Sequence, residues 1–327
     1  MIVSFDTILR PPYELNQTIL KYVASISEKI GEVNASFIVK ASPELRKRNN
    51  IKTIQSSLQI EGNTLSEQEI TAILDDKRVL GPKQDILEVE NAIRVYDSLN
   101  DFKFDSVRSF LQAHKMLMQG LVETPGAFRR KEVGVMKGSQ IKHVAPPAGN
   151  VKFLMNDLFH YLKHDDELAL IKSCVFHYET EFIHPFDDGN GRMGRLWKTL
   201  ILMSHQPLFQ YVPFETLIAK TQDDYYKTLS LCDKAGKSDA FIEYMLSILD
   251  EALRDLLSVS RPITMNQQRR LSHFCSLNKS PFTRKDYIHV FKNLSSASAS
   301  RDLKAGVDSG LFSKSGDKNS TLYRLSI

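Results

Sequence analysis

Residues 184–195 read HPFDDGNGRMGR and join two apolar runs, LIKSCVFHYETEFI and LWKTLILM, which both have the residue spacing of helices. The stretch contains three glycines, two arginines, two aspartates, an asparagine and a histidine, which neither a packed helix nor a solvated turn requires. It is predicted to be a loop between two helices, with its glycines at the N-terminus of the second. Unpaired backbone N–H groups and the helix dipole attract anions at such a position.

The residue types of the loop suit a polyphosphate. Gly189 and Gly191 let the backbone curl so that successive N–H groups converge on phosphate oxygens. Asn190 can adopt a left-handed conformation and adds a side-chain donor. Arg192 and Arg195 are three residues apart, on one face of the second helix, and offer planar donor groups for further oxygens.

Two more side chains add chemistry to this phosphate site. Asp188 supplies a hard oxygen ligand for a Mg²⁺ ion carried by the phosphates. His184 titrates near neutral pH and can take a proton from a hydroxyl. A P-loop is excluded, because no G-x-x-x-x-G-K-[ST] occurs. The pattern favours nucleotide chemistry over the alternative of a glycine-rich turn with surface ion pairs.

The stretch resembles the Fic-family motif, His-Pro-Phe-x-[Asp/Glu]-Gly-Asn-Gly-Arg-x-x-Arg, and matches it at every fixed position. His177, Glu181 and the segment at 225–249 also resemble that family, and the resemblance covers about residues 50–258. It implies a mainly α fold, a Fic-type helical bundle. It also implies transfer of AMP from ATP to a Ser, Thr or Tyr hydroxyl of a target protein, or of the chain itself, with release of pyrophosphate.

The resemblance implies a role for most residues of the loop. His184 is the general base and Asp188 holds Mg²⁺. The α- and β-phosphates are held by an anion hole of Gly189, Asn190 and Gly191. The outer phosphates are neutralised by Arg192 and Arg195. Phe186 anchors the loop in the core, and Gly189, where kinase-like relatives carry lysine, favours nucleotidyl transfer. Transfer of UMP or phosphocholine and removal of AMP stay open, as does whether Tyr225 and Tyr226 line a nucleobase pocket or pack in the core.

The segment SSLQIEGN (56–63) places Ser57 and Glu61 on one helix face before a Gly-Asn stop. Any exposed helix can end in this way, but in a Fic-like chain the segment resembles the inhibitory motif Ser-x-x-x-Glu-Gly. The resemblance implies an inhibitory helix at about 50–63. On this helix Glu61 pairs with Arg195 and blocks the position in which the γ-phosphate would bind productively. Glu61 could also orient water for AMP removal, which would make the protein bifunctional.

Residues 132–144, EVGVMKGSQIKHV, alternate apolar and polar positions on both sides of a Lys-Gly-Ser turn. This predicts a β-hairpin, with an irregular loop as the alternative. The resemblance implies that the hairpin is the family's flap, whose open strand edge pairs with an extended segment of the target.

Most of the remaining chain is predicted to be helical. Apolar positions recur at helical spacing in residues 14–40, 85–99, 105–121, 150–163, 167–182, 195–203 and 238–258. No run of about 18 apolar residues occurs, and the first residues lack the pattern of a signal peptide. Three widely spaced cysteines suit neither a disulfide framework nor a zinc site, so we expect a cytoplasmic, membrane-free protein.

The charge is uneven along the chain. Residues 261–327 carry 12 Lys and Arg against 4 Asp and Glu, whereas the rest carries 31 against 35. With a lapse in helical pattern at 258–268, this predicts three regions: an N-terminal helical region carrying the inhibitory helix, a catalytic core and a basic module. Their expected bounds are 1–104, 105–258 and 259–327.

The basic module resembles a winged helix-turn-helix over residues 281–327. Its presumed recognition helix offers Arg301 and Lys304 for phosphates, beside Ser298 and Ser300. It is predicted either to bind DNA or to serve as a packing module, including one that forms a homodimer. A rival function for the chain is therefore a DNA-binding regulator whose nucleotide site senses rather than catalyses.

Overall fold

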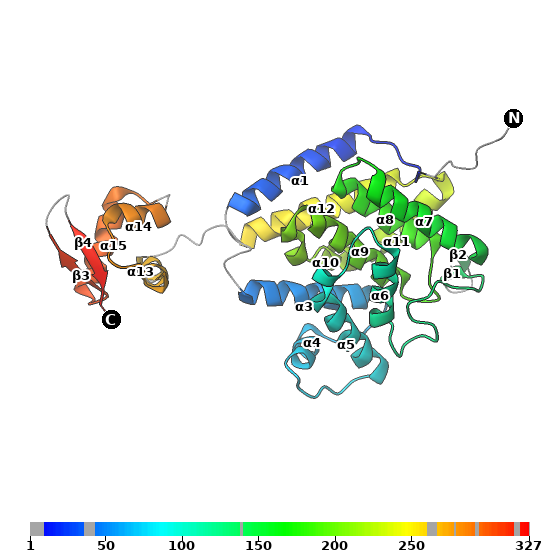
Figure 1. Ribbon diagram of the computed structural model, residues 1–327, viewed down its shortest axis with the longest axis horizontal. Helices are drawn as coiled ribbons and strands as arrows, with labels where there is room; N and C mark the ends of the chain where they lie inside the picture. The colour runs from blue at the N-terminus through cyan, green and yellow to red at the C-terminus, as the bar shows by residue number, and fades with distance from the viewer. Residues whose placement is uncertain are drawn as a thin grey trace. The chain divides into compact units, whose positions relative to one another are not determined.

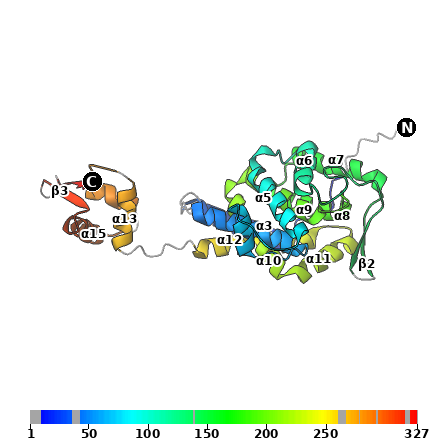
Figure 2. The same ribbon diagram turned by 90° about the horizontal axis from the view of Figure 1, so that it is seen from below.

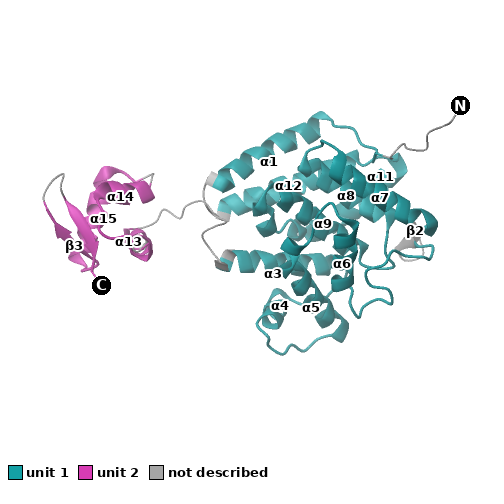
Figure 3. Ribbon diagram, in the orientation of Figure 1, with its two compact units in different colours: residues 1–259 teal, residues 260–327 magenta. Residues whose placement is uncertain are grey.

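The computed structural model describes residues 10–35, 43–137, 140–259, 267–277, 279–291, 294–316 and 321–326. The chain divides into two compact units, residues 1–259 and residues 260–327 (Figure 3). Both are built mainly from helices, which confirms the predicted fold class. The finer division at residue 104 stays a prediction.

In the part of unit 1 that the structure describes, helices form a bundle with one two-stranded sheet (Figure 1). Its α-helices are α1 (Gln17–Ala35), α3 (Pro43–Ile60), α4 (Glu67–Leu74), α5 (Lys83–Asp97), α6 (Val107–Leu117), α7 (Ala148–His164), α8 (Ala169–Ile183), α9 (Asn190–His205), α10 (Glu215–Lys220), α11 (Gln222–Ala235) and α12 (Asp239–Val259). Two short 3₁₀ helices are η1 (Leu99–Asp101) and η2 (Pro207–Tyr211).

Helices α8 and α9 form the centre of unit 1 and pack against each other. Both are buried over most of their surface, and the buried side chains include polar and charged ones such as His177, Arg195 and Lys198. Trp197 of α9 lies in an aromatic cluster, with ring centroids 5.0 Å from Phe110 and 6.3 Å from Phe159. Helix α12 covers α8 and carries α1 on its outer side, while α3 packs between α5 and α10. The loop that joins α8 to α9 is therefore held between two deeply buried helices.

Some helix bounds differ from those that the apolar pattern predicts. Helix α1 ends at Ala35, and residues 36–42 lie outside the described residues. Helix α9 begins at Asn190, five residues before its apolar pattern, since backbone hydrogen bonds continue through the glycines. Helix α3 begins at Pro43 and ends at Ile60, so it is longer at its start than predicted and Glu61 follows its last turn.

The predicted β-hairpin is confirmed. Strand β1 (Gly134–Lys137) pairs antiparallel with β2 (Gln140–Val144), in a register that sets Gly134 opposite Val144 and shifts between Val135 and Met136. The two turn residues at 138–139 lie outside the described residues. The hairpin lies beside α11 at one end of unit 1 (Figure 2).

Over its described residues, unit 2 has three helices followed by a two-stranded antiparallel sheet. These are α13 (Gln267–Ser276), α14 (Arg284–Val290), α15 (Ser296–Asp308), β3 (Phe312–Ser315) and β4 (Leu322–Leu325). Thr283 caps α14, in a capping box with Asp286. Phe282 bridges to Tyr323 of β4, and a small core gathers around Phe274 and Leu303. From α14 onward the elements suit a winged helix-turn-helix, whereas α13 was not predicted; assignment to the winged-helix class remains a prediction.

In the ranges that the structure describes, no helix combines the length and the apolar character needed to cross a membrane.

Candidate active site

The loop between α8 and α9 is fixed at both ends by residues in the left-handed region. His184 ends α8 with φ 50°, and Gly189 precedes α9 with φ 85°. A non-glycine residue in this region is strained, so the surroundings must stabilise it. A Cβ on Gly189 would also lie 2.8 Å from the sulfur of Met118. Glycine is therefore the least strained residue at that end of the loop.

The interior of the loop is anchored by Phe186 and Asn190. Phe186 is fully buried, with its ring stacked on His114 at 3.6 Å and near Phe110 at 5.3 Å, as predicted for an anchor. Asn190 accepts from the backbone N–H of Phe186 at 2.8 Å and donates to its carbonyl at 2.9 Å. Asn190 thus lies in α9, not in the left-handed region, and one N–H of its amide is already used within the loop. The amide has a second N–H, which together with the backbone N–H can still serve an anion.

The imidazole of His184 is half-buried at the end of α8. Its Nδ1 lies 3.4 Å from the carbonyl oxygen of Glu181, a contact that favours the tautomer with the proton on Nδ1. In that neutral tautomer Nε2 carries the lone pair, as a general base requires. The carbonyl of His184 accepts from Arg129 Nε at 2.7 Å, which fixes the backbone that carries the imidazole.

Arg195 is fully buried and bound by the segment predicted to be inhibitory. Its Nη2 donates to Glu61 Oε1 at 2.7 Å and to the Ser57 carbonyl at 2.9 Å, and its Nε donates to Ser57 Oγ at 3.1 Å. Burial is the largest influence on the pKa of Arg195 and lowers it, but the nearby Glu61, Tyr225 and Glu181 side chains together hold that pKa above its usual value. The contact implied for Glu61 and Arg195 is present.

The Glu61 carboxylate also fills the space over the predicted anion site. A Cβ on Gly191 would collide with Glu61 Oε1 and would lie 3.3 Å from Glu181 Oε1. Carboxylate oxygens of Glu61 and Glu181 therefore lie directly against Gly191, in the first turn of α9. In this state, Glu61 stands where a phosphate group would approach.

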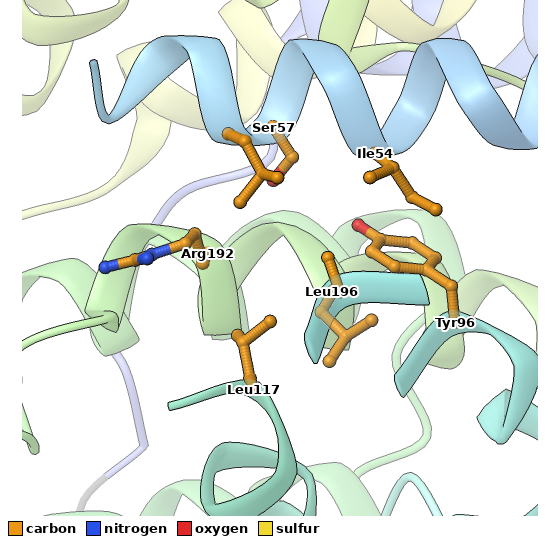
Figure 4. A pocket seen from close by; sticks show the side chains of 8 residues that line it. Ile54, Ser57, Tyr96, Leu117, Arg192 and Leu196 are labelled. Carbon is orange, nitrogen blue, oxygen red and sulfur yellow. The ribbon is translucent and has the colours of Figure 1, made fainter. Parts of the chain in front are cut away.

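Helix α3 packs closely onto α9. Ile54 and Ser57 point from α3 toward Arg192 and Leu196 of α9 (Figure 4). A cavity of about 10 Å³ remains between them, enough for one water molecule at most. The space between the two helices is therefore too small for a nucleotide in this state.

Arg192 is also occupied, by two carboxylates. Its Nη1 lies 3.2 Å from Glu88 Oε1 of α5, and its Nη2 lies 3.1 Å from Asp188 Oδ2. The Glu88 side chain is 12% exposed and accepts from Asn63 Nδ2 at 2.9 Å, whereas Asp188 is 59% exposed. The buried contact orients the guanidinium from behind, and the exposed one can be exchanged for a ligand. Sequence reasoning did not find Glu88, because no spacing rule relates it to Arg192.

Asp188 fits the chemistry of a magnesium ligand. It is an exposed carboxylate next to the anion site, with Oδ1 accepting from the N–H of Gly189 at 2.6 Å. Among the described residues, no group of three or more His, Cys, Asp or Glu side chains is arranged to hold a metal. Mg²⁺ commonly binds through one or two carboxylates together with substrate phosphates, and a single carboxylate here suits that mode.

His177, Glu181 and Tyr225 form a buried chain beneath the loop. His177 Nε2 lies 3.0 Å from the Tyr225 hydroxyl, which donates to Glu181 Oε1 at 3.1 Å. Burial lowers the pKa of His177 well below its usual value and keeps the ring neutral. A Cβ on Gly194 would lie 2.6 Å from that ring, so glycine lets it approach α9. Tyr225 is thus a core residue, and the exposed Tyr226 is the one left for a nucleobase pocket.

His114, which sequence reasoning missed, holds the other end of the loop. Its Nδ1 accepts from the N–H of Gly126 at 2.9 Å, so the proton is on Nε2, which donates to the Asp188 carbonyl at 3.0 Å. Burial lowers the pKa of His114 to about 4, with the positive charge of Arg192 as a smaller cause. The only sequence signal was a histidine on the apolar face of the helix at 105–121.

We expect His114 to make the stability of unit 1 depend on pH. The unfolded chain binds a proton on His114 below pH 6.5, whereas the folded chain does so only near pH 4. Stability is therefore complete above pH 6.5 and declines as the pH falls to 4, by up to about 3 kcal/mol from this group. Urea unfolding of wild type and His114→Gln measures the free energy of unfolding of each. The difference between these two free energies should shrink from pH 7 to pH 4, and a constant difference would contradict the assignment.

Comparison with known proteins identifies the class. The family model described as Fic/DOC family matches residues 104–202. Over 97% of this chain and 98% of the other, the fold is similar to that of a Fic family protein from Desulfovibrio desulfuricans G20, with a TM-score of 0.76 and 37% identity. Fic-1 (aa134–508) from C. elegans shares the fold at a TM-score of 0.61 and 21% identity, over 74% and 72% of the two chains.

The helical bundle and its glycine-rich loop thus define a Fic fold, and the chain belongs to the Fic family. Proteins named protein adenylyltransferase Fic are also similar. The one from Drosophila mojavensis is 28% identical over 71% of this chain and 46% of its own length. The one from Aedes aegypti is 31% identical over 47% and 32%. The chain matches less than half the length of these two relatives.

Proposed function

We propose that this protein is a protein adenylyltransferase, which transfers AMP from ATP to a Ser, Thr or Tyr hydroxyl of a target protein or of itself. The observation that carries the proposal is the loop at 184–191. It brings a half-buried imidazole and the N–H groups at the start of α9 together with two arginines. The similarity to proteins named protein adenylyltransferase Fic supports the same chemistry.

The reaction assigns one task to each part of the site. His184 Nε2 takes the proton of the target hydroxyl, whose oxygen forms a bond to the α-phosphorus of ATP. The bond between that phosphorus and the oxygen leading to the β-phosphate breaks, and pyrophosphate leaves. The N–H groups of Asn190 and Gly191, the dipole of α9 and the Gly189 N–H, once it releases Asp188 Oδ1, stabilise the charge on the α- and β-phosphates. Arg192 and Arg195 neutralise the outer phosphates. Bound Mg²⁺, held by Asp188, would add positive charge beside the leaving group.

Glu61 and Ser57 are proposed to restrain this activity. An arginine that donates to a carboxylate cannot use the same N–H groups for a phosphate, and a carboxylate over Gly191 repels phosphate oxygens. The described conformation is therefore proposed to be the inhibited one. AMP removal is a second candidate activity, since the same carboxylate could orient a water molecule near the phosphorus.

The hairpin β1–β2 is proposed to dock the target. It stands next to α11 and offers strand edges to an extended segment. Main-chain pairing would hold the segment independently of most of its side chains.

The direct test follows where the label goes. ATP labelled on the α-phosphate should label protein in the presence of Mg²⁺, and ATP labelled on the γ-phosphate should not. Label from the γ-phosphate would instead indicate kinase chemistry. Release of AMP from protein labelled beforehand would favour AMP removal as the activity.

Unit 2 supports a second proposed function, DNA binding. Two of its four acidic residues are used inside the unit. Asp302 is buried against Arg270, and Asp286 caps α14 and pairs with Lys279. On the outside, Arg284 donates to Ser300 and Arg301 donates to Ser298, so these guanidinium groups meet hydroxyls. Among the described residues neither arginine has a carboxylate within 4.0 Å, which leaves a cationic surface that suits backbone phosphates.

We expect the full chain to bind duplex DNA with an affinity that falls as salt rises. The variant Arg301→Ala/Lys304→Ala should flatten the slope of log K against log salt by about two units, because each phosphate contact contributes about 0.9. Fluorescence anisotropy at several salt concentrations measures the slope. The control is Lys279→Ala, whose charge already pairs with Asp286. An unchanged slope, or no binding at low salt, would favour a packing or dimerising unit.

A further inference from the structure

Arg129 lies in the segment between α6 and β1, and its side chain joins three separate stretches of backbone. It is 3% exposed. Nε donates to the His184 carbonyl at 2.7 Å, and Nη1 donates to the Lys131 carbonyl at 2.9 Å. Nη2 donates to the Pro146 carbonyl at 2.5 Å and to the Ile183 carbonyl at 3.3 Å. The backbone N–H of the same residue donates to the Pro185 carbonyl at 2.9 Å.

This arrangement is unusual for a buried cation. Among the described residues, no carboxylate lies within 4.0 Å of the Arg129 guanidinium, and its partners are neutral carbonyls. A buried charge is costly unless hydrogen bonds replace its hydration. Arginine has five N–H donors in a fixed plane, so it can bind several carbonyls from different directions at once. Packing alone would not select an arginine here.

The carbonyls that Arg129 binds belong to two functional parts. Lys131 and Pro146 flank the hairpin, one before β1 and the other after β2. Ile183 and His184 end α8, where the strained left-handed backbone sets the direction of the imidazole. A positive group at the last carbonyls of a helix also interacts favourably with the helix dipole. One side chain thus links both ends of the hairpin to the backbone of the catalytic loop.

We propose that Arg129 is a positioning residue, which fixes the hairpin that docks the target relative to the His184 imidazole. The proposal rests on the proposed adenylyl transfer. It places Arg129 apart from the phosphate contacts, which come from the start of α9 and from Arg192 and Arg195. Loss of Arg129 therefore impairs use of the protein acceptor and leaves ATP binding nearly unchanged.

The experiment uses Arg129→Gln and Arg129→Lys in the full-length chain, in the Glu61→Gly background. Arg130→Gln is the matched control, because it removes the same charge from the exposed neighbouring residue. We expect kcat/KM for a protein acceptor to fall about 100-fold in Arg129→Gln, as a misplacement of about 1 Å can cause, with the Kd for ATP within about two-fold. Arg129→Lys should not restore transfer, because one ammonium group cannot reach all three stretches.

Hydrogen exchange provides a readout that does not depend on activity. In both Arg129 variants, but not in Arg130→Gln, amides of residues 131–137 and 183–189 should exchange faster together. This result would support the link even if the Glu61→Gly parent transferred no AMP, an outcome that would count against the proposed function alone. Transfer equal to that of the parent, or faster exchange in only one of the two segments, would overturn the proposal. If Arg129→Gln fails to fold, Arg129→Lys decides, and wild-type transfer by it would also overturn the proposal.

Discussion

Replacing Glu61 with glycine is expected to raise AMP transfer by about 30-fold, since a hydrogen bond to a charged partner is worth about 2 kcal/mol. In the described state, Arg195 Nη2 donates to Glu61 Oε1 at 2.7 Å and the same carboxylate covers Gly191. ATP must displace it before its outer phosphates reach the arginine. The glycine variant removes that competition, and the initial rate of label transfer from α-labelled ATP measures the gain.

The same substitution should lower stability while activity rises. Arg195 is fully buried, and loss of its carboxylate partner leaves a buried charge, which commonly costs 3–5 kcal/mol. The melting temperature without nucleotide should therefore fall, and ATP should restore it in part, because phosphates then pair with the guanidinium. A rise in activity together with a fall in stability distinguishes release of an inhibited state from a general gain in folding stability.

Two further variants test the cause of inhibition. Glu61→Gln keeps the size of the side chain and an oxygen acceptor but removes the charge, so its rate should lie between those of wild type and Glu61→Gly. Ser57→Ala removes only the bond from Arg195 Nε and keeps the bond to the Ser57 carbonyl, so its effect should be small. A Glu61→Gly variant no faster than wild type would remove the inhibitory role.

Local sequence patterns were enough for most of the long helices, the hairpin and the position of the loop, but not for α10 or α13. Apolar spacing predicted α5, α7, α8 and α12 to within a few residues, and alternation around a glycine turn predicted β1 and β2. Such elements are specified by nearby residues, whose periodicity is visible in the chain. The contact of Glu61 with Arg195, 134 residues away, came only from the family resemblance, because no local rule relates them.

The side chains that hold the loop from outside were not predictable in this way. His114 and Arg129 bind carbonyl oxygens, which every residue has, so no partner type could have indicated them. The segment GAFRR offers two adjacent arginines, and only the fold shows that the first is buried and the second exposed. Asn190 shows the opposite case, in which residue type suggested a contact that the fold uses differently. Its residue type suggested an anion donor, but its amide is used to close the loop on Phe186.

Replacing His184 with alanine in the Glu61→Gly background is expected to lower AMP transfer by about 10²- to 10⁴-fold, the usual contribution of a positioned general base. The substitution leaves the backbone carbonyl that Arg129 binds, so the loop keeps its anchor on that side. The N–H groups of α9, Arg192 and Arg195 are also unchanged. ATP affinity should therefore stay within a few-fold of the parent, and the loss should appear in kcat.

This double variant also separates catalysis from sensing. If the site only senses nucleotide, an ATP-dependent response such as a change in DNA affinity should persist without His184, because a sensor needs the phosphate contacts and no base. If the site transfers AMP, the double variant should bind ATP but acquire almost no label. Equal labelling with and without His184 would contradict the assignment of the base, and the search would then move to Glu181 and Asp188, the carboxylates nearest the anion site.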